Sequence, residues 1–216
     1  MPEPLSQIEA RILGALVEKQ LTTPEYYPLT LNALIAACNQ KTNREPVVSY
    51  DEETVARALD HLRDKNLVYV FYGSTSRVVK YKHMLPSVYE LDAPEVAIIA
   101  VLMLRGPQTL GELRERTARL YEFSGLGEVN ETLDKLAKRD DPLVVKLGRQ
   151  AGQKEARFAH LLCGETGLQV SSEEATARIS QPAGGRIEKL EEEVAALRSE
   201  VEELKQTVDE FKKQFE

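Results

Sequence analysis

The stretch that decides the fold runs from residue 6 to residue 83, and its phrases are SQIEARILGALVEK (6–19), LTLNALIAAC (29–38), DEETVARALDHLRDKN (51–66), LVYVFYG (67–73) and RVVKYKH (77–83). The first three phrases repeat apolar residues at the three- and four-residue spacing of amphipathic helices. The last two are rich in β-branched and aromatic residues around a polar turn, which predicts a β-hairpin. Three short helices followed by a hairpin is the order of a winged-helix domain.

The same order is found a second time further along the chain. Its phrases are APEVAIIAVLMLRG (93–106), TLGELRERTARL (109–120), GEVNETLDKLAKRD (127–140), LVVKLGRQ (143–150) and EARFAHL (155–161). Residues 6–85 and 93–163 are therefore two copies of one unit, with a period too long for a solenoid repeat. We predict a mainly α fold with small β-hairpins (α+β), built from two tandem winged-helix domains at residues 1–92 and 93–165.

Hydroxyl and carboxylate residues mark where the helices begin. Ser6 with Glu9, and Thr109 with Glu112, have the spacing of a capping box. Thr30 is placed to cap the second helix, and Ser49 or Asp51 to cap the third.

The C-terminal tail has a heptad pattern, preceded by a predicted linker at residues 166–186. Apolar residues alternate three and four apart at Ile187, Leu190, Val194, Leu197, Val201, Leu204, Val208, Phe211 and Phe215. β-Branched residues at position a with Leu at position d favour two parallel strands. The flanking pairs Arg186 with Glu191, Glu193 with Arg198 and Glu200 with Lys205 are attractive in a parallel pair. We expect residues 187–216 to form a parallel coiled-coil homodimer; the alternative is a lone amphipathic helix that folds back on its own domains.

The net charge of −7 belongs mostly to this tail. Residues 1–92 carry 10 Lys and Arg against 12 Asp and Glu, residues 93–165 carry 11 against 11, and residues 166–216 carry 7 against 12. Because both domains are nearly neutral, binding to a polyanion requires a local basic patch.

The hairpins and one loop supply the candidates for such a patch. The third helices begin with acidic residues (Asp51, Glu52 and Glu53; Glu128 and Glu131), which repel phosphate. The candidate nucleic-acid contacts are Arg77, Lys80 and Lys82 in the first hairpin, Lys146, Arg149, Lys154 and Arg157 in the second, and Lys41, Asn43 and Arg44 in the loop 39–46. The alternatives are a solvated strand face for the hairpins and a hydrogen-bonded structural role for the loop.

Catalytic and membrane signals are missing from the sequence. His61, His83 and His160 are far apart, and we find no nucleophile elbow, metal-spaced His/Glu pair or phosphate-binding loop. Cys38 and Cys163 form no CxxC pair and are expected to be reduced thiols. With no apolar run long enough to span a bilayer and no signal-peptide pattern, we expect a cytoplasmic protein that is not an enzyme and has no cofactor or metal.

Four longer phrases carry a family resemblance: EKQLTTPEYYPLTLNALIAACNQKTNREPV (18–47), ELRERTARLYEF (112–123), EVNETLDKLAKRDDPLVVKL (128–147) and RFAHLLCGE (157–165). They resemble the YceH-like family of uncharacterised bacterial proteins over residues 5–165. The resemblance implies a tandem winged-helix fold in a cytoplasmic bacterial protein, and it carries over no catalytic or binding residue. Two hypotheses follow from the sequence. One is a homodimeric regulatory protein that binds double-stranded DNA through basic wings, and the other is a scaffold that binds a protein through the same surfaces.

Overall fold

The structure, a computed structural model, describes residues 3–72, 78–148 and 155–164. Met1–Gln169 forms one compact unit. The first half of this unit contains α1 (Gln7–Thr22), the 3₁₀ turn η1 (Pro24–Tyr26), β1 (Leu29–Thr30), α2 (Leu31–Cys38), α3 (Glu52–Asp64), β2 (Val68–Tyr72), β3 (Val79–His83) and α4 (Leu85–Tyr89). The second half contains α5 (Ala93–Arg105), α6 (Leu110–Thr117), α7 (Leu126–Ala137), β4 (Val144–Lys146) and β5 (Phe158–His160).

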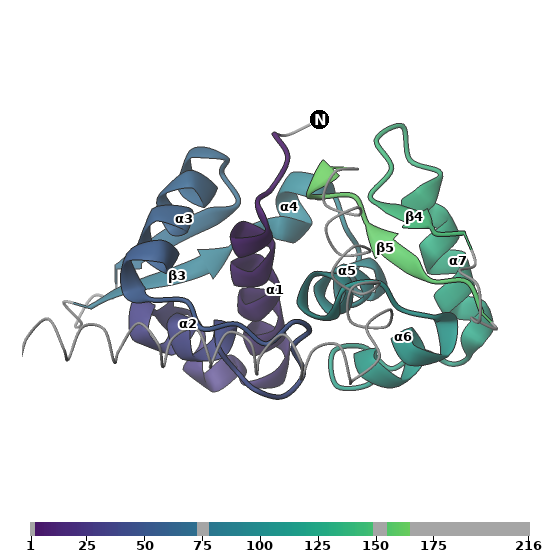
Figure 1. The fold of residues 1–216 in the computed structure, drawn as a ribbon, viewed down its shortest axis with the longest axis horizontal. Coiled ribbons are helices and arrows are strands. Elements are labelled where there is room, and N and C mark those ends of the chain that lie inside the picture. The colour runs from purple at the N-terminus through teal and green to yellow at the C-terminus, as the bar shows by residue number, and fades with distance from the viewer. Residues whose placement is uncertain (1–2, 73–77, 149–154, 165–216) are drawn as a thin grey trace, which may run out of the picture. The chain divides into compact units, whose positions relative to one another are not determined.

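The predicted α+β class and the repeated order of elements are both present. Three helices precede an antiparallel hairpin in each half, as α1, α2, α3, β2, β3 and then α5, α6, α7, β4, β5 (Figure 1). The predicted linker at 166–186 and the heptad segment at 187–216 lie outside the described residues.

The predicted caps begin the helices where expected. Ser6 and Glu9 form a reciprocal capping box, in which the Ser6 amide donates to Glu9 Oε2 at 2.6 Å and the Glu9 amide donates to Ser6 Oγ at 3.2 Å. Thr109 and Glu112 form a second box, and Thr30 caps α2. Asp51 rather than Ser49 caps α3, since its carboxylate accepts from the amide of Thr54 at 2.8 Å.

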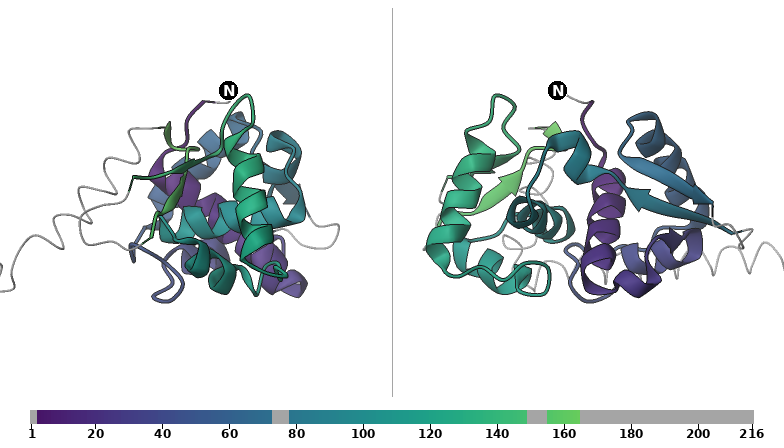
Figure 2. Two further views of the ribbon diagram at one scale, coloured as in Figure 1. Left: turned by 90° about the vertical axis from the view of Figure 1, so that its right-hand side faces the viewer. Right: turned by 180° about the vertical axis from the view of Figure 1, so that it is seen from behind.

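The centre of the compact unit is a helix pair, one helix from each half. Figures 1 and 2 show α1 and α5 side by side, with α2, α3 and the first sheet outside α1 and with α6, α7 and the second hairpin outside α5. They approach closely at Gly14, where an added Cβ would lie 2.9 Å from Leu104 Cγ. Nearly all of α5 is buried, from Glu95 to Leu104, because both halves pack against it. One hydrophobic core therefore serves both halves.

In each half, the residues just before the second helix pair with the hairpin and extend it. In the first half the sheet order is β1-β3-β2, and β1 pairs with β3 through Leu29 and Tyr81. In the second half Gln108 takes the corresponding place, exchanging backbone hydrogen bonds with Phe158 at 3.0 and 2.7 Å. The sequence pattern did not predict these short pairings or α4.

Candidate functional site

The outer face of the first hairpin carries two aromatic and two lysine side chains. In the β2–β3 ladder Tyr69 is paired with Lys82 and Phe71 with Lys80. Directly paired residues project from the same face of a sheet. These four residues form one surface, which we call the hairpin patch. Tyr69 is 61% exposed and Phe71 is 43% exposed, so the aromatic rings of the patch face solvent.

The opposite face of the hairpin is anchored in the core. Val68 and His83 are paired there and buried. The His83 amide donates to the Tyr27 hydroxyl at 2.7 Å, and the His83 imidazole contacts the Gln20 side-chain oxygen. Burial lowers the pKa of His83 to about 4. This anchoring turns the hairpin patch outward.

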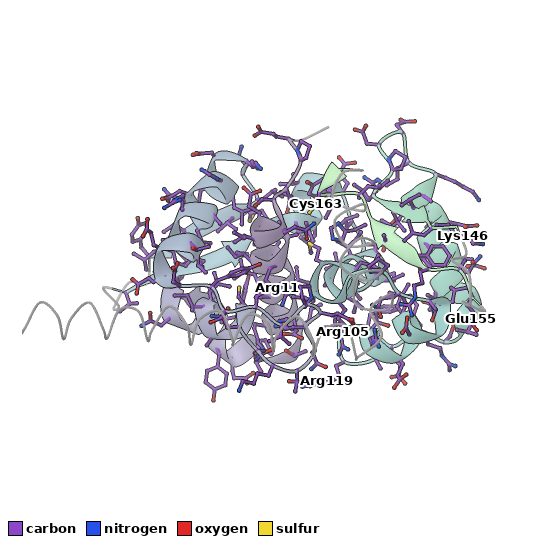
Figure 3. All side chains as sticks on the ribbon, in the orientation of Figure 1. Arg11, Arg105, Arg119, Lys146, Glu155 and Cys163 are labelled. Atoms are coloured by element: carbon purple, nitrogen blue, oxygen red, sulfur yellow. The ribbon has the colours of Figure 1, made fainter. Side chains whose placement is uncertain are left out.

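The second hairpin is shorter, and its described basic residues have partners within the protein. Lys146 Nζ lies 5.8 Å from the centre of the Phe158 ring. Arg157 Nη1 donates to the Pro107 carbonyl at 2.8 Å and to Glu112 Oε2 at 3.1 Å. Figure 3 shows Lys146 at the outer side of the second half. Three further candidates, Arg77, Arg149 and Lys154, lie outside the described residues.

The third helices present acidic surfaces, as their sequences suggested. On α3, Arg57 pairs with Glu53 and Arg63 with Asp60, while Glu52 and Asp64 are exposed. On α7, Glu128 accepts hydrogen bonds from the Ser124 amide and hydroxyl and from the Tyr121 hydroxyl, and these bonds lower its pKa. Lys138, the residue that follows α7, pairs with Asp134 of this helix. Neither helix presents an uncompensated cluster of cations to a phosphate backbone.

Two buried arginines hold the loop 39–46 against α1. Arg44 is 6% exposed, and it donates to Glu18 Oε2 at 2.6 Å and to the Ala37 carbonyl at 2.8 Å. Arg11 donates to the Pro46 carbonyl at 2.7 Å. Of the two roles considered for Arg44, the geometry supports the structural one, because a buried and bidentately paired guanidinium is not placed to contact DNA. Lys41 and Asn43 are exposed on the same loop.

A polar cleft at the junction of the two halves escaped the sequence analysis. It has a volume of about 230 Å³ and lies where the ends of α1, α5 and α6 meet the loop. Asn43, one of the candidate nucleic-acid contacts, lines this cleft and accepts a hydrogen bond from Arg105. The cleft brings together residues distant in sequence, so only the tertiary structure reveals it.

Comparison with known proteins identifies the family. A family model described as "Protein of unknown function, DUF480" matches residues 5–153. The chain belongs to the DUF480 family. Among its relatives, a UPF0502 protein of Opitutus terrae is 56% identical over 90% of this chain and 83% of its own length. One from Pelobacter propionicus is 52% identical over 98% of both chains, and the UPF0502 protein YceH of Escherichia fergusonii is 46% identical over 93% and 95%.

These matches confirm the YceH-like resemblance of this DUF480 chain, and they extend to the region of the heptad pattern. Within the described residues, none of the helices has the length and apolar character needed to cross a membrane. The same residues contain no group of three or more His, Cys, Asp or Glu side chains arranged to hold a metal ion.

Proposed function

We propose that this DUF480 protein is a cytoplasmic, non-enzymatic homodimer of tandem winged-helix domains that binds duplex DNA through the first hairpin. The observation that carries the proposal is the hairpin patch, where Lys80 and Lys82 alternate with exposed aromatic rings on one outward face. The repeated order of three helices and a hairpin supports the winged-helix assignment.

The patch has the chemistry that a nucleic-acid backbone requires. Lys80 and Lys82 are two residues apart on β3, about 6.8 Å along the strand, which lets them reach neighbouring phosphates. Tyr69 and Phe71 provide apolar surface beside them for sugars and base edges. In this arrangement the hairpin makes the contacts, and the acidic α3 and α7 stay out of the major groove.

Dimerisation through the heptad segment would present two hairpin patches to one duplex. Leu197 occupies a central d position of that segment. Sedimentation analysis should show a dimer for the natural sequence and a monomer for Leu197→Glu, because a charge at position d is incompatible with the apolar seam. The matched control is Glu202→Gln, which lies off the seam and should leave the dimer intact.

A fluorescence anisotropy titration against random and genomic duplexes across a range of salt concentrations tests DNA binding. Two lysines on each of two protomers give about four phosphate contacts, so log K should fall against log salt with a slope of roughly −4. Absence of an anisotropy change at low salt would exclude the DNA proposal.

The edge position of β2 favours a second candidate function, binding to a protein. Among the described strands β2 pairs only with β3, so its other side offers backbone groups to an added strand. Tyr72, at the end of β2 and 74% exposed, adds apolar surface on the opposite face of the strand from Tyr69 and Phe71. Exposed apolar edge strands are recurrent sites of strand addition.

Phe71→Lys separates the two candidate functions by the sign of its effect. A third lysine on the hairpin patch should strengthen DNA binding, because it adds a phosphate contact. The same change should weaken an apolar protein interface, because it places a charge at the centre of the surface. The anisotropy titration and a binding assay with a captured protein partner read out the two directions.

A further inference from the structure

The lining of the polar cleft between the two halves has more positive than negative side chains. It is formed by residues from the end of α1, the loop 39–46, the end of α5, α6 and the segment after α6. The residues with charged or amide side chains in this lining are Glu18, Lys19, Gln40, Asn43, Arg105, Arg116 and Arg119. Four are cations and one is a carboxylate, and Figure 3 shows Arg105 and Arg119 at the lower part of the junction.

The single carboxylate of the lining is already paired. Glu18 accepts two hydrogen bonds from Arg44, at 2.6 and 3.1 Å, and Lys19 Nζ lies 3.3 Å from Glu18 Oε2. Burial alone raises the pKa of Glu18, but its bonds with Arg44 outweigh this effect and hold the pKa below its ordinary value. Because Arg44 and Lys19 share the single negative charge of Glu18, this carboxylate does not balance the four cations of the lining.

Two arginines of the lining repel each other. Partial burial lowers the pKa of Arg105, and the nearby charge of Arg116 lowers it further. Arg105 donates to Asn43, while Arg116 donates to Gln108 and lies 3.5 Å from Glu112. Of the three arginines in the lining, only Arg116 has a carboxylate within ion-pair distance among the described residues.

Helix dipoles explain only part of this arrangement. Lys19, Arg105 and Arg116 lie in the last turns of α1, α5 and α6, where cations offset the negative end of the helix dipole. Arg119 lies beyond the end of α6 and still lines the cleft. The dipole effect acts on each helix separately. It therefore does not explain why the cations of three helices line the same cleft.

We propose that this cleft binds a compact oxyanion with at least two negative charges, carried on phosphoryl or carboxylate groups. The planar forks of Arg105, Arg116 and Arg119 suit both groups, since each can donate two parallel hydrogen bonds. The volume of about 230 Å³ fits a small anion and not a drug-sized ligand. Such an anion would touch residues of both halves, from Lys19 and Asn43 to Arg105 and Arg119, and so link them.

Calorimetric titration of the full chain with inorganic pyrophosphate and with citrate, at an ionic strength fixed by sodium chloride, tests the proposal without DNA. We expect saturable binding of one or both anions and a rise in the thermal midpoint. Pyrophosphate alone would identify a phosphoryl ligand, and citrate alone a carboxylate ligand. Saturation by neither anion would overturn the proposal.

The double variant Arg105→Gln with Arg119→Gln should bind the effective anion at least about tenfold more weakly, because two charge-assisted contacts are lost. The matched control is Arg114→Gln, an exposed position of α6 outside the lining, which should bind as the natural protein does. Equal binding by the double variant would also overturn the proposal. Arg119→Gln alone repeats the test at an exposed position whose replacement leaves the core untouched.

Discussion

The two hairpins occupy the same place in the two halves of the chain but present different surfaces. The first has five-residue strands and an outward patch of Tyr69, Phe71, Lys80 and Lys82. The second has three-residue strands, and its Arg157 is hydrogen-bonded to Glu112 and to a backbone carbonyl. The duplicated order of elements therefore does not duplicate the hairpin patch.

The two hairpins share one feature at the end of their second strands. Each hairpin ends in a histidine, His83 on β3 and His160 on β5, and burial lowers the pKa of both to about 4. Each histidine is paired with a buried valine, His83 with Val68 and His160 with Val144. We therefore expect the two halves to differ in binding and to resemble each other in stability.

The loop 39–46 distinguishes the first half from the second. Breaking the contact between this loop and α1 should have the largest effect on stability. Arg44→Ala leaves the partly buried Glu18 without its main partner, which should lower the free energy of unfolding by about 3 kcal/mol. Chemical denaturation measures this change. Lys41→Ala, an exposed position of the same loop, should stay within about 0.5 kcal/mol. A cost near that of Lys41→Ala would contradict the structural role of Arg44.

The dependence of stability on acid pH tests the burial of His83 on the inner face of the first hairpin. His83 titrates near pH 4 in the folded protein and near 6.5 when unfolded, so the unfolded state binds more protons between these values. The contribution of neutral His83 to the free energy of unfolding is therefore fully present above pH 6.5. It falls by about 3 kcal/mol as the pH drops to 4. His83→Gln should flatten this part of the profile in urea unfolding series. An unchanged profile would show that His83 is not buried in its neutral form.

Gly14 tests whether the two halves share one core. Gly14→Val would place a branched side chain against Leu104 at the contact of α1 with α5, and it should cost about 2 kcal/mol through overpacking. Unfolding followed by circular dichroism should remain a single transition, because α5 is packed from both sides. Gly111→Ala, with open space around its Cβ, should be neutral or slightly stabilising. Two separate transitions would mean that the halves unfold independently.

The smallest expected effect concerns the second hairpin. Arg157→Gln removes a partly exposed ion pair with Glu112, which should cost about 1 kcal/mol of stability. DNA affinity should not change, since the guanidinium is directed to partners within the protein. Denaturation and anisotropy on the same variant measure the two quantities. A loss of DNA affinity with unchanged stability would assign Arg157 to the interface.

Local features of the fold could be predicted from the sequence. The capping box of Ser6 and Glu9 depends on residues three apart, and the β2–β3 strands on a run of β-branched and aromatic residues. The central position of α5 also had a signal, because AIIAVLML is apolar on every side and such a helix must be covered all round.

The sites depend on tertiary contacts that no local pattern records. An arginine in a polar loop looks the same whether it binds phosphate or, like Arg44, a partly buried carboxylate on α1. The cleft joins Lys19 to Arg119 across a hundred positions of the chain. The outward direction of Lys80 and Lys82 likewise follows from which face of the sheet meets α1.

The most direct test of the difference between the hairpins is an anisotropy titration at about 50 mM salt. Two double variants are compared. One carries Lys80→Gln and Lys82→Gln in the first hairpin, and the matched one carries Lys146→Gln and Arg157→Gln in the second. We predict that the first pair weakens duplex binding roughly 100-fold, because two phosphate contacts are lost per protomer, and that the second pair changes it less than about threefold. Equal losses from both pairs, or a loss from the second pair alone, would contradict the assignment of binding to the first hairpin.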